Sequence, residues 1–153
     1  IQQFESDLAA YCGTAGAAVV QSGTAAIHLA LRLLDIQPND KVICQSLTFI
    51  GSSNPILYEK AQPIFVDSEE ATWNLCPLAL EEAIKACEKE GALPKAIIVV
   101  HLYGMPAKMK EIMEIAQRYG IAVIEDAAEA LGSFIDGQAC GSICTWLHSF
   151  DDA

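Results

Sequence analysis

Short runs of β-branched residues alternate along this chain with longer amphipathic stretches, and turn residues separate the two kinds of segment. This alternation predicts repeated strand–helix–strand units, in which parallel strands are covered by helices on both faces. The expected fold class is therefore α/β, a three-layer αβα sandwich with a mainly parallel sheet. The expected strands are residues 17–21, 41–45, 63–66, 95–100 and 121–125. The expected helices are residues 2–12, 24–34, 51–60, 77–90 and 106–119, the first of them burying Phe4, Leu8 and Tyr11.

The composition indicates one packed domain and disfavours two classes of partner. Of the 153 residues, 52% are hydrophobic and 19% are charged, which suffices for a core and excludes a disordered chain. No Pro- or Gly-rich linker divides residues 1–153, so we expect a single domain. The formal net charge of -11 makes nucleic acid and anionic membranes poor candidate partners. Because no apolar run approaches roughly 20 residues and no signal peptide is recognisable, a cytoplasmic location is the default expectation.

The six cysteines lie in separate apolar segments rather than in a small secreted framework, which indicates reduced core thiols. Three residues separate Cys140 from Cys144, and His148 is the histidine nearest to them in the sequence. A zinc site would need a closer cysteine pair and a second pair of ligands elsewhere, so we expect no metal.

Ligands of parallel α/β sheets bind beyond the carboxyl ends of the strands, so the residues that follow each expected strand are the candidate site. Ser22-Gly23-Thr24-Ala25-Ala26 follows the first of these strands and begins a helix. The glycine permits close approach of a ligand, and the free N–H groups of a first helical turn bind anions, a phosphate above all. The alternative is that Ser22 or Thr24 only caps the helix. The P-loop and dinucleotide-binding patterns are both absent.

Three further side chains follow other expected strands. Phe49 could stack on a flat ligand, although a core phenylalanine is the favoured interpretation of this residue taken alone. His101 is expected to be a buried, hydrogen-bonded histidine rather than a general base. Asp126 ends a buried strand, where a carboxylate needs a partner. It either caps a short helix over residues 127–131 or holds a proton on a ring nitrogen of a ligand.

A phosphate-type turn, an aromatic ring and a buried carboxylate are together more specific than each is alone. Pyridoxal phosphate presents three matching groups: an anionic phosphate, a flat pyridine ring and a basic ring nitrogen. A carboxylate keeps that nitrogen protonated, so that the ring can act as an electron sink for a substrate carbanion. The sequence therefore predicts a pyridoxal phosphate site.

These residues resemble the DegT/DnrJ/EryC1/StrS sugar aminotransferases, a family of pyridoxal-phosphate-dependent enzymes with fold type I, the aspartate-aminotransferase-like superfamily. The resemblance runs from about Phe4 to Phe150, nearly the whole chain. The matching stretches are Phe4-Glu5 with Tyr11 and Gly13, residues 22–26, Thr48-Phe49, and residues 63–67, 100–104 and 125–133.

The resemblance implies a set of cofactor-binding residues, which are Gly23, Thr24, Ala25, Phe49, Asp126, Ala128, Glu129 and Ser149. Gly23, Thr24 and Ala25 would hold the cofactor phosphate through their backbone and the Thr24 hydroxyl. Ser149 would be a second phosphate ligand.

The remaining four residues would contact the pyridine ring. Phe49 and Ala128 would pack on its two faces, and Asp126 would pair with its nitrogen. Glu129 stands where the family often has Gln or His near the phenolic oxygen. The implied activity is amination of a nucleotide-linked keto-sugar in surface polysaccharide or glycan biosynthesis, commonly with glutamate as amino donor and with active sites built across a homodimer.

The sequence departs from the family pattern at its carboxyl end. The Schiff-base lysine of the family is expected directly after Ala153, so no catalytic residue is assigned within the chain. We expect residues 1–153 to be the large, cofactor-binding domain, incomplete at its C-terminus and without the small C-terminal domain. In addition, Asp151-Asp152-Ala153 replaces the usual small or Asn-rich turn, and residues 141–148 lack a second glycine.

Two alternatives to an aminotransferase remain open. The first is a non-catalytic, truncated relative that binds the cofactor or a partner chain. The second is a pyridoxal-phosphate-dependent sugar dehydratase, in which a histidine replaces the lysine.

Overall fold

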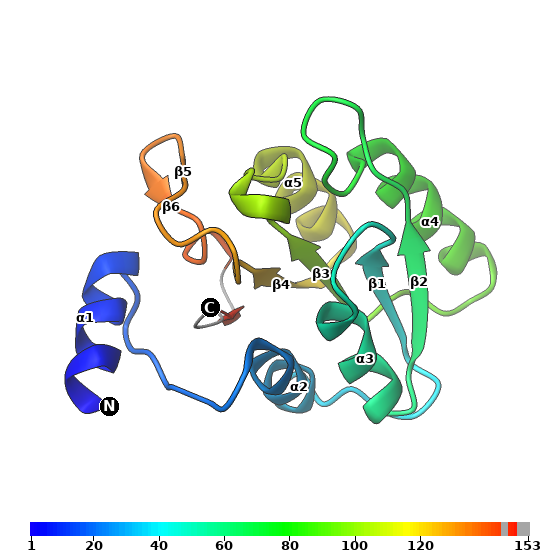
Figure 1. Cartoon of the computed structure of the whole chain (residues 1–153). Coiled ribbons are helices and arrows are strands. Elements are labelled where there is room, and N and C mark those ends of the chain that lie inside the picture. Colours follow the sequence, from blue (N-terminus) through cyan, green and yellow to red (C-terminus); the bar gives the residue numbers. More distant parts are fainter. Residues whose placement is uncertain (145–146, 150–153) are drawn as a thin grey trace.

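A five-stranded parallel sheet forms the centre of the fold (Figure 1). The computed structural model describes residues 1–144 and the backbone of residues 147–149. The strands are β1 (Lys41–Gln45), β2 (Gln62–Val66), β3 (Ala96–Val100), β4 (Ala122–Asp126) and β7 (Leu147–Ser149), in the spatial order β2-β1-β3-β4-β7. Because all neighbouring strands are parallel, β1, β3 and β4 end at the same edge of the sheet, with Val100 opposite Asp126.

Helices cover both faces of this sheet and give the molecule three layers (Figure 1). One face carries α2 (Gly23–Leu33) and α3 (Ile50–Tyr58), and the other carries α4 (Pro77–Lys89) and α5 (Met109–Tyr119). Successive residues of a strand point to opposite faces, so strands that are buried on both sides need near-continuous apolar sequences. The strand residues packed on the α2 and α3 side include Val42, Cys44, Ala96, Ile98 and Ile124. Those packed on the α4 and α5 side include Ile43, Ile97, Val99 and Val123. The expected αβα sandwich is confirmed.

Local sequence signals set several helix ends. Gly13 follows α1 (Gln2–Cys12) and Gly120 follows α5, both with the left-handed backbone that glycine adopts without strain. By contrast, α5 begins at Met109, three residues later than expected. The preceding residues hydrogen-bond elsewhere, because the Ala107 N–H is donated to His101 Nδ1 and the Met105 carbonyl accepts from Asn74.

α1 lies apart from the main sheet and packs against a hairpin of β5 (Phe134–Ile135) and β6 (Gln138–Ala139) (Figure 1). The rings of Tyr11 and Phe134 meet edge to face, with their centroids 6.2 Å apart. The expected burial of Phe4 and Tyr11 is wrong, since they are 47% and 45% exposed and Leu8 is only partly buried. A two-stranded hairpin is too small to cover the whole apolar stripe of a helix.

Residues 17–21 form no strand, which corrects another expectation. They run extended between α1 and α2 (Figure 1), and Val19 and Val20 are exposed. No strand in the described part of the chain pairs with this segment, and the Val19 N–H donates instead to Glu5 Oε1 at 2.9 Å. β-Branched residues favour a strand only where a neighbouring strand supplies hydrogen-bond partners.

All six cysteines are free thiols, and every one except Cys76 is buried. Within residues 1–144 and 147–149, no helix has the length and apolar character needed to cross a membrane. The same residues contain no group of three His, Cys, Asp or Glu side chains arranged to hold a metal ion. The His148 side chain, part of the disfavoured zinc site, lies outside the described residues.

Candidate functional site

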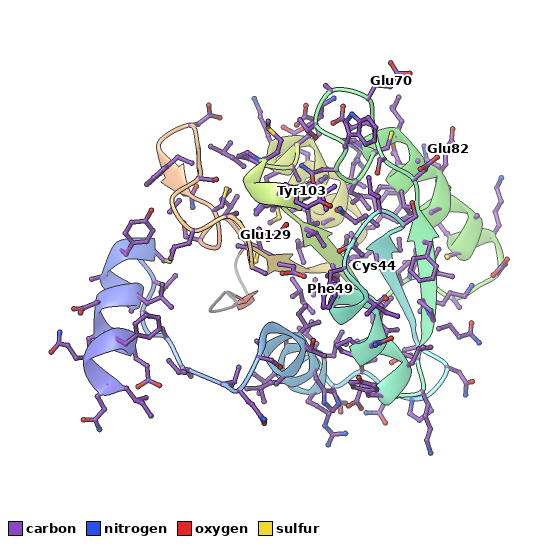
Figure 2. The ribbon with its side chains drawn as sticks, in the orientation of Figure 1. Cys44, Phe49, Glu70, Glu82, Tyr103 and Glu129 are labelled. Carbon is purple, nitrogen blue, oxygen red and sulfur yellow. The ribbon has the colours of Figure 1, made fainter. Side chains whose placement is uncertain are left out.

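The expected site residues lie at the carboxyl edge of the sheet. The chain leads from β1 to Phe49, from β3 to His101, and from β4 to the turns that contain Glu129. Figure 2 shows Phe49, Tyr103 and Glu129 near the middle of the molecule, where these strands end. Ser149 ends β7, and its Cα is the register partner of Asp126. The Ser149 side chain lies outside the described residues, so its role as a phosphate ligand stays a prediction.

The first turn of α2 carries the three residues expected to bind phosphate. Ser22 caps this helix, because its Oγ accepts the Ala25 N–H at 3.2 Å, so the capping alternative is correct for Ser22. An anion at this turn would meet the positive end of the helix dipole and the hydroxyl of Thr24. The Ala25 N–H could bind such an anion only if it gave up its hydrogen bond to Ser22 Oγ.

Thr24 and Phe49 approach one another over the backbone of Gly51. A Cβ atom at position 51 would lie 2.8 Å from Thr24 Oγ1 and 2.9 Å from Phe49 Cδ1, closer than real Cβ atoms come. The hydroxyl expected at the phosphate and the ring expected at the pyridine therefore share one small space. The Phe49 side chain is 75% exposed, so the core interpretation of this residue is wrong, and the ring is available for stacking.

Asp126 is buried at the end of β4, with 5% of its surface exposed. Its Oδ2 accepts the hydroxyl hydrogen bond of Ser52 at 2.7 Å, and its Oδ1 accepts the Ala128 N–H at 3.3 Å. The bond to Ala128 closes a local turn. Residues 127–131 form turns rather than a helix, so the helix-capping interpretation of Asp126 is wrong.

The buried thiol of Cys44 lies near this carboxylate. Burial, together with the negative charge of Asp126, raises the pKa of Cys44 to about 12. The thiol therefore stays protonated near neutral pH and is a poor nucleophile. A buried aspartate is costly unless it is hydrogen-bonded or paired with a cation, which makes Asp126 a natural partner for a protonated ring nitrogen.

His101 and Glu125 form a second, fully buried polar pair behind the site. The Nδ1 of His101 accepts the Ala107 N–H at 3.0 Å, so its Nε2 carries the hydrogen and donates it to Glu125 Oε1 at 2.8 Å. The expectation of a hydrogen-bonded, structural histidine is confirmed. Glu125 also accepts the backbone N–H groups of Gly141 at 2.6 Å, Ile143 at 3.0 Å and Cys144 at 3.2 Å. One carboxylate thus holds the turn that precedes β7.

Glu129 joins the turn after β4 to the turn after β3. Its Oε2 accepts the Tyr103 N–H at 2.8 Å. Tyr103 has a left-handed backbone with φ 52° and an exposed ring, a conformation that costs a bulky residue free energy and that this bond stabilises. The Ser133 hydroxyl donates to the Gly104 carbonyl at 2.7 Å and fastens the same two turns. Glu129 therefore has a positioning role toward Tyr103 that the sequence did not indicate.

Two residues of this region escaped the sequence-based prediction, Ser52 and Glu125. The available signal was the spacing of two hydroxyl residues, since Thr48 lies just before α3 and Ser52 lies in its first turn, four residues later. That spacing does not reveal Asp126 as the partner, because 74 residues separate it from Ser52. Glu125 lay inside a matching stretch, but its backbone partners become visible only in the folded structure.

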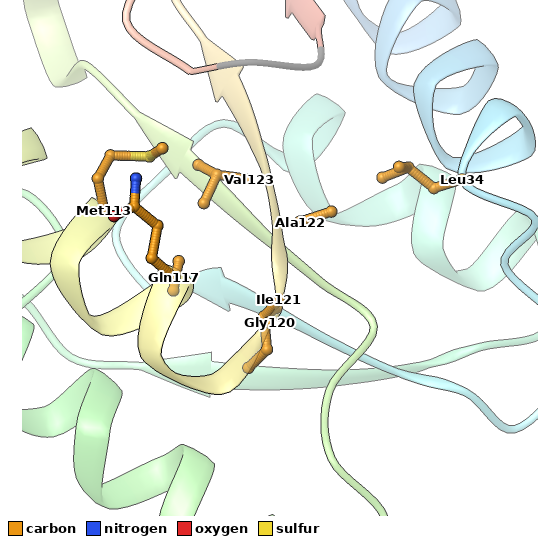
Figure 3. A pocket seen from close by; sticks show the side chains of 8 residues that line it. Leu34, Met113, Gln117, Gly120, Ile121, Ala122 and Val123 are labelled. Carbon is orange, nitrogen blue, oxygen red and sulfur yellow. The ribbon is translucent and has the colours of Figure 1, made fainter.

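A separate hollow of about 340 Å³ lies at the opposite edge of the sheet (Figure 3). Its walls include Leu34, Met113 and Val123, and it opens near the start of β4 rather than near Asp126. Its lining contains no titratable side chain. This hollow is therefore not part of the candidate site.

The side chains of the site fit pyridoxal phosphate by their chemistry. The N-terminus of α2 with the Thr24 hydroxyl suits an anionic phosphate, and the exposed ring of Phe49 suits a flat heterocycle. The buried carboxylate of Asp126 suits a protonated ring nitrogen. The absence of a side chain on Gly51 brings the first two of these groups together.

Comparison with known proteins agrees with this assignment. Residues 1–151 match the model of the DegT/DnrJ/EryC1/StrS aminotransferase family. EpsN of Bacillus subtilis (strain 168), a proposed pyridoxal phosphate-dependent aminotransferase, is 54% identical over 142 residues, which cover 93% of this chain and 37% of EpsN. A GDP-perosamine synthase of Caulobacter vibrioides is 43% identical over 143 residues, covering 94% of this chain and 37% of that protein.

A solved structure shares the fold as well. The crystal structure of S. venezuelae DesV in complex with a ketimine intermediate superposes with a TM-score of 0.84 and 41% sequence identity. The superposition covers 92% of this chain and 36% of DesV. The present chain thus spans a little more than a third of the length of the proteins that it matches.

Proposed function

We propose, from the premise that this chain belongs to the DegT/DnrJ/EryC1/StrS aminotransferase family, that it supplies the cofactor-binding part of a nucleotide-sugar aminotransferase. The family match covers residues 1–151, so the membership applies to nearly the whole chain. The reaction of the whole protein would be the transfer of an amino group to a nucleotide-linked keto-sugar. The enzyme would serve polysaccharide or glycan biosynthesis.

One observation supports the proposal most strongly: the buried carboxylate of Asp126 lies at the strand edge where Thr24 and Phe49 converge. Ser52 connects the two parts, because it follows Gly51 directly in α3 and donates to Asp126 Oδ2. A hydroxyl, an aromatic ring and a carboxylate in this arrangement match the three parts of pyridoxal phosphate. The family aminotransferases use this cofactor, and EpsN carries it in its name.

Each residue has a distinct task in this proposal. Thr24 and the α2 N-terminus bind the phosphate, and Phe49 orients the ring by stacking. Asp126 holds a proton on the ring nitrogen, while Ala128 borders the other face of the ring. Bound pyridoxal phosphate would supply the electron sink for a carbanion at the substrate carbon.

Glu129 has a different task from the one implied by Gln or His at this position in the family. An ionised carboxylate only accepts hydrogen bonds, so it cannot donate one to a phenolate oxygen. In this chain it accepts from the backbone of Tyr103 instead. We propose that Glu129 supports the turn that contains Tyr103, and that it lies next to the cofactor without bonding to its phenolic oxygen.

The substrate, amino donor and assembly of the whole protein follow from the same premise. A nucleotide-linked keto-sugar, with glutamate as amino donor, suits an enzyme related to GDP-perosamine synthase. We propose a homodimer that acts in the cytoplasm. Assay of keto-sugar amination with glutamate, using the protein as its gene encodes it, distinguishes an aminotransferase from a module that only binds the cofactor.

The cofactor site itself is tested by Asp126→Asn, which removes the charge and keeps the shape of the side chain. Titration of the protein with pyridoxal phosphate, followed by cofactor fluorescence, should show binding that is weaker by about tenfold, because a charge-assisted contact is worth about 1.5 kcal/mol or more. Asp7→Asn, on the exposed face of α1, is the matched control and should bind like wild type. Equal affinities of wild type and Asp126→Asn would contradict the proposed site.

A further inference from the structure

We propose that Ser52 is a positioning residue for Asp126, and that Thr48 and Ser52 form a hydroxyl relay that fixes the carboxylate and its charge. This inference rests on the proposed function, because Asp126 must act on the cofactor for its orientation to matter. It assigns a role to the Ser52 side chain, which lies outside the matching stretches, and to the Thr48 hydroxyl, which the Thr48-Phe49 match leaves without a role. The relay reaches Asp126 from α3, on the helix layer that also carries the phosphate turn.

The direction of the two hydrogen bonds follows from the chemistry of their groups. An ionised carboxylate can only accept, so the Ser52 O–H must point at Asp126 Oδ2, 2.7 Å away. A serine hydroxyl has one hydrogen, and Ser52 donates that hydrogen to Asp126. The contact of 2.9 Å between Thr48 Oγ1 and Ser52 Oγ is therefore a bond donated by Thr48. The relay runs from Thr48 through Ser52 to Asp126.

Burial strengthens these hydrogen bonds. Ser52 is 3% exposed and Asp126 is 5% exposed, so water competes little for either group. In such surroundings a hydrogen bond is stronger than in water, and chained hydroxyls polarise one another. A bond to the charged form of a carboxylate also favours that form. The relay therefore favours the ionised form of Asp126, the form that can hold a proton on a ring nitrogen.

The relay also connects the carboxylate to the stacking ring. Phe49 lies between Thr48 and Ser52 in the sequence, in the turn that begins α3. Ser52 is buried and Thr48 is half-buried in this turn, while the Phe49 ring is exposed. One short turn thus positions two contacts of a bound ring. It orients Asp126, which would meet the ring nitrogen, and it carries Phe49, which would stack on the ring face. A change in the relay should affect ring binding without a large change in the fold.

The chain offers well-matched variants for a test. Ser52→Ala removes the donor to Asp126, and Thr48→Val removes the second hydroxyl while preserving the side-chain shape. Thr48→Ser keeps that hydroxyl. Ser53→Ala is the control on the same helix, because the Ser53 hydroxyl donates to the Ile50 carbonyl rather than into the site. Asp126→Asn serves as the reference variant.

Two measurements on the protein loaded with pyridoxal phosphate separate positioning from structure. The dissociation constant should rise about threefold to tenfold for Ser52→Ala and less for Thr48→Val. The pH at which the absorbance of the bound cofactor changes should move lower in both variants, because a carboxylate that is no longer held in place pairs less well with the ring proton. Thr48→Ser and Ser53→Ala should behave like wild type. Urea unfolding without cofactor shows whether each variant is folded.

The outcomes distinguish this inference from the proposed function. If Asp126→Asn weakens binding but Ser52→Ala and Thr48→Val match wild type in affinity and in the absorbance transition, the relay is refuted and the cofactor site stands. If Asp126→Asn also binds like wild type, the proposed function fails and the relay fails with it. If Ser52→Ala does not fold, the pair Thr48→Val and Thr48→Ser decides. Identical absorbance transitions for that pair would overturn the relay.

Discussion

Glu125 shows how much of this fold depends on a single buried side chain. Its carboxylate accepts hydrogen bonds from His101 and from the backbone of Gly141, Ile143 and Cys144. These donors come from the turn after β3 and from the turn before β7. A fully buried charge with several donors is stable, but removal of the charge leaves the donors without an adequate acceptor.

Glu125→Gln should therefore lower the free energy of unfolding by about 2 to 4 kcal/mol, because an amide presents N–H groups where the carboxylate accepts. Urea denaturation measures this loss. Hydrogen exchange should quicken at the amides of Gly141, Ile143 and Cys144. Glu114→Gln, on the exposed face of α5, is the control and should leave both quantities unchanged. Unaltered exchange at the three amides in Glu125→Gln would show that the carboxylate does not hold this turn.

The residues at strand ends were predictable because parallel strands bring their carboxyl ends to one edge. The order of strands and helices in the sequence suffices to place Asp126 and Phe49 at that edge, and both lie there. The favoured interpretation of Phe49 as a core residue was wrong, because an apolar side chain after a strand can equally face a ligand. Ser52 could not be predicted, since its partner is remote in the sequence and a serine in a first helical turn has no distinctive pattern.

At the scale of elements, the loop after β2 is fastened to the turn after β3 by two polar side chains. Asn74 donates to the Met105 carbonyl at 2.8 Å and accepts the Leu102 N–H at 2.9 Å. Glu69 pairs with Lys108 at 2.6 Å and accepts the N–H of Thr72 at 2.6 Å. The Lys108 ammonium and the Thr72 hydroxyl lower the pKa of Glu69 to about 2. The loop is therefore held in part by the negative charge of Glu69.

This charge predicts a defined dependence of stability on pH. The pKa of Glu69 is lower in the folded chain than its ordinary value of 4.5, so its contribution is fully present above pH 4.5. The contribution is lost as the pH falls from 4.5 towards 2, where the folded carboxylate takes up its proton. Glu69→Gln should accordingly be less stable than wild type at neutral pH, and the difference should shrink across that interval.

Urea denaturation at a series of pH values measures the difference between Glu69→Gln and wild type. Glu70→Gln is the control, because Glu70 is the neighbouring residue and points away from the molecule (Figure 2). Its difference from wild type should be small at neutral pH. A difference in unfolding free energy between Glu69→Gln and wild type that stays constant from neutral pH to about pH 2 would show that the Glu69 charge is not its cause.

Most elements could be located from periodicity, and the failures share a physical cause. β1, β3 and β4 have apolar runs that the sheet buries on both sides, so their patterns are strong. Residues 17–21 have a similar composition but no neighbouring strand among the described residues, and the late start of α5 depends on hydrogen bonds to His101 and Asn74. Both features depend on distant parts of the chain, which local patterns do not contain.

At the scale of the whole molecule, the described residues form one large part and one small part. The larger part is the parallel sheet with its two helical layers, which contains both large apolar clusters. The smaller part is α1 with the β5–β6 hairpin (Figure 1). The extended segment that precedes α2 joins α1 to the larger part, and the turns after β4 join the hairpin to it. Among the described residues, no member of the two large clusters precedes Ile27 in the sequence. The sheet should therefore fold without α1.

Deletion of residues 1–16 tests this division. The deletion removes the buried side chain of Cys12, the contact between Tyr11 and Phe134, and the bond from the Val19 N–H to Glu5. These losses should lower the free energy of unfolding by no more than about 2 kcal/mol. Hydrogen exchange at the amides of β1, β3 and β4 should remain slow, because their partners lie within the sheet. Ile27→Ala, which truncates a core residue of α2, should cost about 2 to 5 kcal/mol and provides the scale for comparison. A deletion variant that loses cooperative urea unfolding altogether would mean that α1 is integral to the core, despite the small surface that it buries.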